Sequence, residues 1–322
     1  MTSSKPFSDV PASANPNPTR FELHIDEEKL KDFKTLLKLS PIAKQTYENL
    51  RGDGEFGVSH KWMVDAKKHW QESFDWYVRS LGVNTALTFN RRKEEDRINT
   101  LPNFKIDIKD DDGNTYNIHF AALFSSKPDA IPIAFLHGWP GSFLEFIPLL
   151  EILRKKYTPE NLPYHIIVPS LPGYTLSADP PLDKDWTTVD DARIIHKLLL
   201  SLGFGSSGYL VQGGDIGSLV ARVIAASYDE CKGMHLNFMF NHGILEMKSE
   251  DDEFSEQEKE GLARMEKFIA RGRAYAHAHE TKPATIGMVM ASSPVAQLAW
   301  IGVSLNTPPF QKPTNIPPRR SS

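Results

Sequence analysis

The segment Gly213-Gly214-Asp215-Ile216-Gly217 constrains this chain more than any other part of the sequence. It follows an apolar run at 209–211 and opens a helix-like run at 218–224. A sharp turn from a strand into a helix needs small residues, because the two backbones come close and the central residue is strained. The pattern predicts such a turn. It also predicts that Asp215 is a nucleophile, which can attack carbon directly and form an ester.

The composition fits one large α/β domain or two small ones. The 322 residues are 40% hydrophobic, enough for a full core, and the formal charge of -4 gives no reason to expect a nucleic-acid partner. One cysteine, Cys231, excludes an internal disulfide framework and suits a reducing compartment. The sequence shows no apolar run near the roughly 18 residues of a membrane span, and residues 1–19 lack the apolar part of a signal peptide. We therefore expect a cytoplasmic protein with a disordered leader at 1–19.

Strands and helices are expected to alternate from residue 131 onward. Buried-type strands are predicted at 131–136, 165–168, 209–212 and 234–238, and helices at 143–157, 188–202 and 216–228, with Thr187 or Thr188 as a cap. This alternation indicates a mostly parallel sheet with helices on both faces.

The flanking segments have other patterns. We predict a strand at 21–25, a helix at 27–38 capped by Asp26, a helix over 62–81 whose tryptophans pack in the core, and strands at 104–108 and 116–120 joined by an acidic turn. Residues 255–275 predict an amphipathic helix, and 285–301 an apolar segment that Ser292-Ser293-Pro294 breaks. Residues 304–322 are rich in proline and are expected to be disordered.

His137-Gly138-Trp139-Pro140-Gly141 follows the strand expected at 131–136. In a fold with such an elbow, the loop after this strand supplies one backbone N–H of an oxyanion hole, and the residue after the nucleophile supplies the other. We assign these donors to Trp139 and Ile216. Donors at these positions stabilise the negative charge that develops while the ester is hydrolysed.

An ordered series of motifs resembles the epoxide hydrolases, specifically the microsomal-type branch with an N-terminal meander. The matching pieces extend over most of the chain as far as Gly302. They are residues 21–25, Trp70 with Phe74-Asp75-Trp76, Asn99 with Pro102 and Phe104, 118–120, 137–142, 169–174, 213–218, 271–275, 281–285, 293–294 and 299–302.

The resemblance implies an α/β-hydrolase fold with a helical cap and no metal or organic cofactor. It makes Asp215 the nucleophile and Tyr275 one of two cap tyrosines that hydrogen-bond the epoxide oxygen. His137, Gly138, Pro140, Gly213, Gly214 and Gly217 belong to its supporting motifs. The implied regions are a meander at 20–125, a hydrolase core at 126–245, a partial cap at 246–302 and a divergent disordered tail at 303–322.

The sequence departs from the family pattern in two places. The family places a second cap tyrosine, the last sheet strands, an acidic relay residue and a water-activating histidine after the Trp-Ile-Gly segment, whereas the resemblance here stops at Gly302. We therefore expect a truncated or mis-spliced form that lacks the last strands and an evident histidine base. His279 lies in the cap and His235 in a strand. His242, near the sheet edge, is the only local substitute for the base, but we expect it to have a structural or supporting role. Residues 78–90 are a second departure, an expected insertion.

Three functions stay open at this stage. The first is an epoxide hydrolase that converts a small apolar epoxide into a vicinal diol. The second is a haloalkane dehalogenase, which also uses an aspartate at the elbow but needs halide-binding donors in place of phenols. The third is a non-catalytic remnant or binding protein, which the missing base favours. A homodimer through the cap or through an exposed sheet edge is a further expectation.

Overall fold

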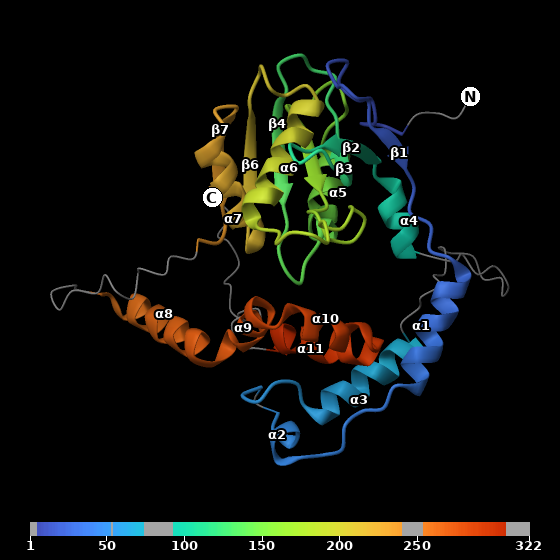
Figure 1. The fold of residues 1–322 in the computed structure, drawn as a ribbon, viewed down its shortest axis with the longest axis vertical. Helices are drawn as coiled ribbons and strands as arrows, with labels where there is room; N and C mark the ends of the chain where they lie inside the picture. The colour runs from blue at the N-terminus through green and yellow to red at the C-terminus, as the bar shows by residue number, and fades with distance from the viewer. Residues whose placement is uncertain (1–4, 53, 74–92, 240–253, 307–322) are drawn as a thin grey trace. The chain divides into compact units, whose positions relative to one another are not determined.

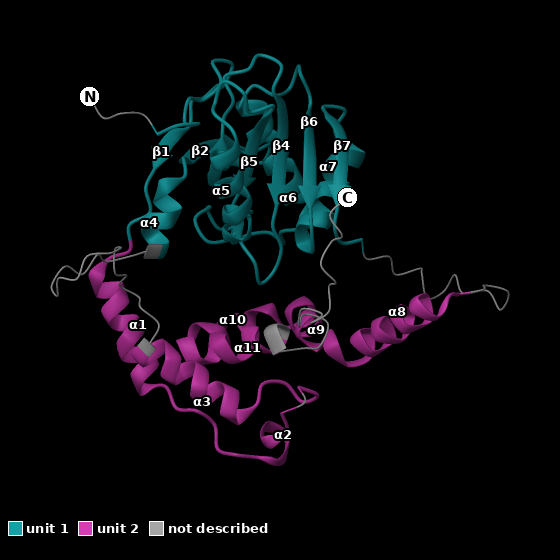
Figure 2. Cartoon of the chain, turned by 180° about the vertical axis from the view of Figure 1, so that it is seen from behind, with its two compact units in different colours: residues 1–24, 79–242 teal, residues 25–78, 243–322 magenta. Residues whose placement is uncertain are grey.

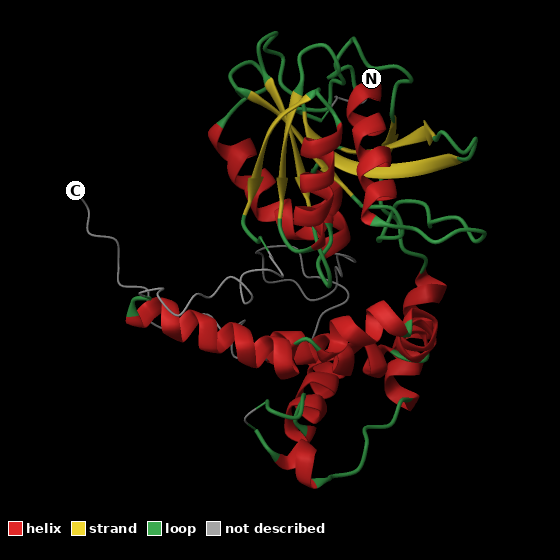
Figure 3. Cartoon of the chain, turned by 60° about the vertical axis from the view of Figure 1, so that its left-hand side comes forward, coloured by secondary structure: helices red, strands yellow, loops and turns green. Residues whose placement is uncertain are grey.

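The computed structural model describes residues 5–52, 54–73, 93–239 and 254–306. The chain divides into two compact units (Figure 2). Unit 1 comprises residues 1–24 and 79–242, and unit 2 comprises residues 25–78 and 243–322. The strands lie in unit 1, whereas the elements described in unit 2 are helical (Figure 3).

Unit 1 is built on a seven-stranded mixed sheet with the strand order β1-β2-β3-β5-β4-β6-β7 (Figure 1). The pairs β1–β2, β2–β3 and β3–β5 are antiparallel, and the pairs β5–β4, β4–β6 and β6–β7 are parallel. It follows that β2, β5, β4, β6 and β7 all run in one direction. The strands are β1 (Thr19–Phe21), β2 (Asn103–Lys109), β3 (Thr115–Leu123), β4 (Ile131–Leu136), β5 (Tyr164–Pro169), β6 (Tyr209–Gly213) and β7 (Cys231–Leu236).

Helices cover both faces of this sheet, as the sequence predicts. One core cluster joins sheet residues such as Phe120 to Ile195 of α6 and Val220 of α7. A second cluster on the opposite face joins Leu123 to Leu150 of α5, together with residues of α4. The helices of unit 1 are α4 (Lys93–Thr100), the 3₁₀ helix η2 (Phe143–Phe146), α5 (Ile147–Lys156), α6 (Thr188–Ser201) and α7 (Ile216–Ser227).

Two predicted helix caps differ in outcome. Thr187 caps α6 in a reciprocal arrangement, in which its hydroxyl accepts from the N–H of Val189 and its own N–H donates to the carboxylate of Asp190. Asp26 precedes α1 as expected, but its side chain forms no capping hydrogen bond.

The leader is ordered from residue 5, so the expectation of disorder is wrong for residues 5–19. Phe7 is buried in the second core cluster, and its carbonyl accepts a hydrogen bond from the N–H of Phe124. Asn15 donates its N–H to the carbonyl of Ser201 at the end of α6. A Ser/Pro/Asn-rich composition predicts disorder only on average, and one buried aromatic with two main-chain bonds is enough to fix this segment.

Unit 2 joins two segments that are far apart in the sequence. Leu37 of α1, Met63 of α3, and Val295 and Leu298 of α11 form its buried core, and Trp62 packs against them. Trp70 also packs there, so the predicted core role is confirmed for Trp62 and Trp70, whereas Trp76 lies outside the described residues. The helices are α1 (Glu27–Leu39), α2 (Tyr47–Leu50), α3 (His60–Lys68), the π-helix η1 (His69–Ser73), α8 (Glu256–Lys267), the π-helix η4 (Phe268–Gly272), α9 (Ala274–Thr281), α10 (Pro283–Ala291) and α11 (Pro294–Asn306).

Several predicted boundaries are corrected. The expected N-terminal region 20–125 is divided between the two units. The lead strand ends at Phe21. Two residues later, the Asn99 side chain hydrogen-bonds both main-chain groups of Leu23: its Oδ1 accepts from the N–H, and its Nδ2 donates to the carbonyl, each at 2.8 Å. Leu23 therefore has no main-chain group left for the sheet. Helix α11 continues to Asn306, so residues 303–306 are not disordered. The 78–90 insertion and residues 307–322 lie outside the described residues.

No described helix is both long enough and apolar enough to span a membrane.

Candidate active site

Asp215 stands at the junction between β6 and α7. Its backbone has φ +50° and ψ −127°, a conformation that residues with a side chain rarely adopt. Ser218 in the first turn of α7 donates its hydroxyl and its N–H to the carbonyl of Asp215. Asp215 itself is exposed. The predicted strand–turn–helix elbow is therefore present, with its carboxylate presented at the end of a strand.

The glycines around Asp215 are required by close backbone approach. A Cβ atom at Gly213 would overlap the carbonyl of Gly217, and a Cβ at Gly217 would overlap the carbonyls of Leu136 and His137. A Cβ at Gly214 would overlap the side-chain amide of Asn237. Backbone atoms cannot move aside as the end of a side chain can, so positions 213 and 217 accept only glycine without distortion, whereas a Cβ at position 214 would require the Asn237 side chain to shift.

The loop after β4 lies directly against the Asp215 side chain. Strands β4 and β6 are parallel neighbours, with Leu136 opposite Gly213, so the loops that follow them meet at one edge of the sheet. The N–H of Trp139 donates to Oδ1 of Asp215 at 2.8 Å. A Cβ at Gly138 would overlap the Asp215 side chain. Ile216 is the first residue of α7, where main-chain N–H groups have no partner within the helix.

His137 holds this loop in place and is not available as a base. It is fully buried, and its Nε2 accepts a hydrogen bond from the N–H of Leu171 at 3.1 Å, which fixes Nδ1 as the protonated nitrogen. Nδ1 lies 3.4 Å from the Gly138 carbonyl, and the ring packs edge-on against Tyr174. Burial lowers the pKa of His137 from 6.5 to about 4, so the ring is neutral.

The depressed pKa of His137 predicts acid sensitivity. In the unfolded chain the ring regains its ordinary pKa of 6.5 and binds a proton more readily than in the folded state. The free energy of unfolding is therefore highest above pH 6.5 and falls as the pH decreases toward 4. Between about pH 7.5 and about pH 5 we expect His137 to account for a loss of about 2 kcal/mol.

Urea unfolding at both pH values measures this loss. The variant His137→Gln, which carries no titrating ring, is expected to lose about 2 kcal/mol less than the parent chain over this interval. His277→Gln is the matched control, because the His277 side chain is 76% exposed on α9. Equal pH dependence of the parent chain and His137→Gln would contradict a buried, neutral His137.

Glu145 is a second acidic group near Asp215, and no sequence motif marks it. It lies on η2, and a Cβ atom at Gly141 would come within 2.8 Å of its Oε2. Burial of the carboxyl, followed by the negative charge of Asp215, raises the pKa of Glu145, and a hydrogen bond from the Gly138 backbone opposes the rise. The spacing of eight residues after His137 carries no signal by itself, because only the η2 turn brings Glu145 back to the loop.

Tyr174, whose ring packs against His137, and Asp191 are two further titratable side chains with raised pKa values. Burial, followed by the charges of Asp191 and Asp215, raises the pKa of Tyr174 to about 12. Asp191 accepts a hydrogen bond from the indole N–H of Trp186 at 2.8 Å, and burial raises its pKa to about 6. Asp190 and Asp191 are adjacent in the first turn of α6, where acidic side chains commonly interact with the helix N-terminus. The sequence therefore predicts an exposed charge at Asp191, whereas the structure buries its carboxyl.

Tyr275 belongs to unit 2, whereas Asp215 belongs to unit 1, and each is described within its own unit. Tyr275 is half-buried on α9, and its ring lies edge-on to that of His279. Nε2 of His279 accepts the indole N–H of Trp300 at 2.8 Å, and burial lowers the pKa of His279. His235 is exposed on β7, and His242 lies outside the described residues.

Comparisons with known proteins agree with this geometry. The family described as "Epoxide hydrolase N terminus" matches residues 18–146, and the family described as "alpha/beta hydrolase fold" matches residues 131–279. A putative epoxide hydrolase of Dothistroma septosporum is 39% identical over 298 residues, which cover 92% of this chain and 66% of the relative. The chain therefore spans about two thirds of the length of this curated relative.

Two solved structures are similar over most of the chain. The epoxide hydrolase of Aspergillus niger is 48% identical, with a TM-score of 0.82, and the match covers 93% of this chain and 72% of that one. The juvenile hormone epoxide hydrolase of Bombyx mori is 26% identical, with a TM-score of 0.65, and the match covers 90% of this chain and 63% of that one. Together with the aspartate at the elbow, these matches show that the chain belongs to the epoxide hydrolase family and has the α/β-hydrolase fold.

Proposed function

We propose that this chain opens small apolar epoxides by attack of Asp215 on a ring carbon. The observation that carries the proposal is the position of the Asp215 carboxylate at the exposed elbow, with Oδ1 bound to the Trp139 N–H. Oδ2 accepts no hydrogen bond from the residues that the structure describes. We therefore assign Oδ2 as the attacking oxygen, because a carboxylate oxygen without a donor keeps its electron density for the new bond.

In the first step, Oδ2 forms a bond to a ring carbon while the bond between that carbon and the ring oxygen breaks. The departing oxygen keeps the electron pair and becomes an alkoxide. Tyr275 is the residue we assign to protonate it, because a phenol can donate a hydrogen bond to the developing negative charge. The product of this step is a hydroxyalkyl ester of Asp215.

In the second step, water adds to the carboxyl carbon of this ester. Negative charge then develops on Oδ1, where the backbone N–H groups of Trp139 and Ile216 are the proposed donors. Collapse of the intermediate breaks the bond between the carboxyl carbon and Oδ2. Oδ2 takes up the proton removed from water and leaves in the vicinal diol, and the oxygen from water stays in the restored carboxylate, whose remaining proton goes to solvent. A base must take the proton from water, and no residue of this chain is assigned to that role.

A chain that stops at the ester is a second candidate function. It is favoured by the surroundings of two histidines: His137 is buried and neutral, and Nε2 of His279 accepts the indole N–H of Trp300. Such a protein would bind one epoxide covalently without turnover. A haloalkane dehalogenase is the remaining alternative, since it also starts from attack by an aspartate at the elbow.

Incubation with styrene oxide and, separately, with 1-bromobutane distinguishes these three functions. We expect styrene oxide to be consumed. The product is its diol if the ester is hydrolysed, and an ester at Asp215 if the reaction stops there. We expect no release of bromide. Tyr275→Phe is expected to slow opening of styrene oxide by about 10²-fold, because the alkoxide then has no phenol to donate to it. Bromide release without consumption of styrene oxide would contradict the proposal and favour the dehalogenase.

A further inference from the structure

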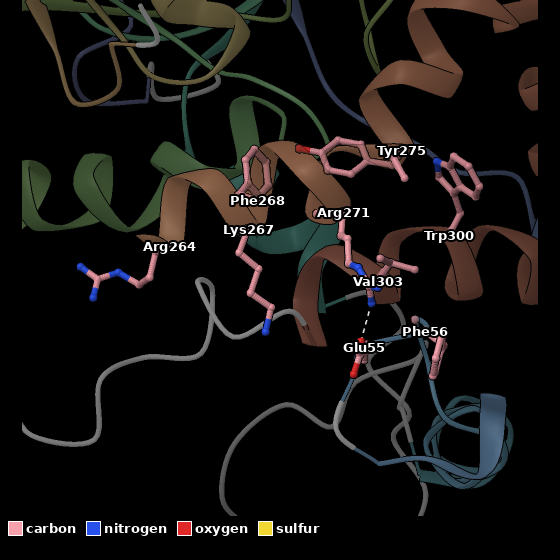
Figure 4. Close-up of a pocket in the computed structure, with 13 residues that line it drawn as sticks. Glu55, Phe56, Arg264, Lys267, Phe268, Arg271, Tyr275, Trp300 and Val303 are labelled. Atoms are coloured by element: carbon pink, nitrogen blue, oxygen red, sulfur yellow. Dashed lines mark hydrogen bonds and ion pairs between the residues drawn. The ribbon is translucent and has the colours of Figure 1, made fainter. Parts of the chain in front are cut away.

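Unit 2 contains a pocket that extends beyond Tyr275, the one described lining residue to which the proposed reaction gives a role. Its volume is about 550 Å³, within the roughly 300–1,000 Å³ range of small-molecule sites. The lining residues that the structure describes belong to unit 2 and come from the loop at 54–57, from α8 with η4, from α9 and from α11 (Figure 4). The pocket can therefore be described without reference to unit 1.

The walls of the pocket are mainly apolar. Phe56, Phe268, Tyr275, Trp300 and Val303 line it. Since the indole N–H of Trp300 is bound to His279, this side chain has no donor left for a ligand and offers only its ring. Gly272 makes room for the Phe268 ring, because a Cβ at position 272 would come within 2.7 Å of it. These walls suit an aliphatic or aromatic chain.

Among the described lining residues, the charged side chains are three cations and one anion, Arg264, Lys267, Arg271 and Glu55. Arg271 forms an ion pair with Glu55 (Figure 4), which neutralises the one carboxylate of the described lining. Arg264 forms an exposed pair with Glu260 at 3.8 Å. The ammonium group of Lys267 forms no hydrogen bond or ion pair with the residues that the structure describes. In Figure 4 the Lys267 side chain extends toward the same side as that of Arg271, whereas Arg264 is turned aside.

We propose that this pocket binds an amphipathic anion, in which an apolar chain ends in a carboxylate. The chain lies against Phe268 and Trp300, and the carboxylate pairs with the ammonium group of Lys267. An apolar wall beside a lysine without a partner among the described residues fits such a ligand better than a neutral or a cationic one, because only the anion forms an ion pair with the ammonium group. The inference goes beyond the proposed function and does not depend on ester formation at Asp215.

Binding of decanoate, measured by titration calorimetry below its micelle-forming concentration, tests the proposal. 1-Decanol carries the same chain without the charge, and decyltrimethylammonium carries the opposite charge. We expect decanoate to bind about 10-fold more tightly than decanol, and decyltrimethylammonium to bind more weakly than both. Added salt is expected to weaken the binding of decanoate and to leave that of decanol unchanged.

Three variants localise the site. Lys267→Gln is expected to weaken decanoate binding about 10-fold without changing decanol binding. Lys259→Gln is the matched control on the same helix, because Lys259 does not line the pocket and pairs with Glu256. Ala274→Phe places a ring in the pocket and should remove the binding of both ligands, with circular dichroism confirming that the variant folds.

Three outcomes would overturn the proposal. The first is the absence of decanoate binding. The second is binding of decanol or decyltrimethylammonium as tight as that of decanoate. The third is an equal effect of the Lys267 and Lys259 substitutions. Because decanoate carries no epoxide, these outcomes are independent of whether Asp215 reacts.

Discussion

Replacement of Asp215 by asparagine is expected to slow ester formation with styrene oxide by on the order of 10⁴-fold. The amide has nearly the shape of the carboxylate and can still accept the N–H of Trp139 through its oxygen. The amide is neutral, however, and its NH₂ group at the Oδ2 position has no lone pair available for attack on carbon. The loss therefore reports the nucleophile itself and not the structure of the loop.

The rate of this step is measured by rapid mixing with styrene oxide and mass analysis of the intact protein. Asp215→Ala is a second variant, because alanine cannot be converted back into aspartate by hydrolysis. Asp229→Asn is the matched control, since Asp229 is exposed after the end of α7 and does not contact the elbow. An Asp215→Asn protein that forms the ester at the rate of the parent chain would remove Asp215 from the mechanism.

Replacement of Gly217 by alanine is expected to lower the free energy of unfolding by about 3 kcal/mol or more. The added Cβ would overlap two main-chain carbonyls, those of Leu136 and His137, at the end of β4. Neither can withdraw without displacing the loop that holds Trp139 against Asp215. Ester formation should therefore fall in the same variant.

Gly287→Ala is the matched control for this substitution. Gly287 also lies inside a helix, α10, and a Cβ there meets no atom within 4 Å. Alanine favours a helix over glycine by about 1 kcal/mol, so this variant should be as stable as the parent chain or more stable. Urea unfolding compares the three proteins. A Gly217→Ala protein that gains stability as Gly287→Ala does would contradict the close approach of α7 to β4.

The elbow and its partner loop could be predicted because their signals are local. Glycine spacing around Asp215 and the apolar run before it specify a strand, a turn and a helix within a few residues. The contact between Trp139 and Asp215 also follows from sequence, since the carboxyl ends of neighbouring parallel strands meet at one edge. The helices on both faces were likewise indicated by the alternation of elements after residue 131.

The features that could not be predicted depend on contacts between distant segments. Phe7 is one aromatic residue in a polar stretch, and the core that it enters is formed by distant residues such as Leu101 and Leu123. Helices α1 and α3 pack against α11 through Leu37, Met63 and Val295. The apolar character of these residues predicts that each is buried, but it does not predict which helix each one contacts. Glu145 is recognised as a neighbour of Asp215 only when the η2 turn is known.

The central claim is that Asp215 forms a covalent ester with an epoxide. Peptide mass spectrometry after brief incubation with styrene oxide and an acid quench tests it most directly, with Asp215→Asn as the control. The predicted result is a peptide that contains Asp215 and is heavier by the mass of one styrene oxide molecule, with no such gain in the control. An unmodified Asp215 peptide, with styrene oxide consumed equally by both proteins, would contradict the claim.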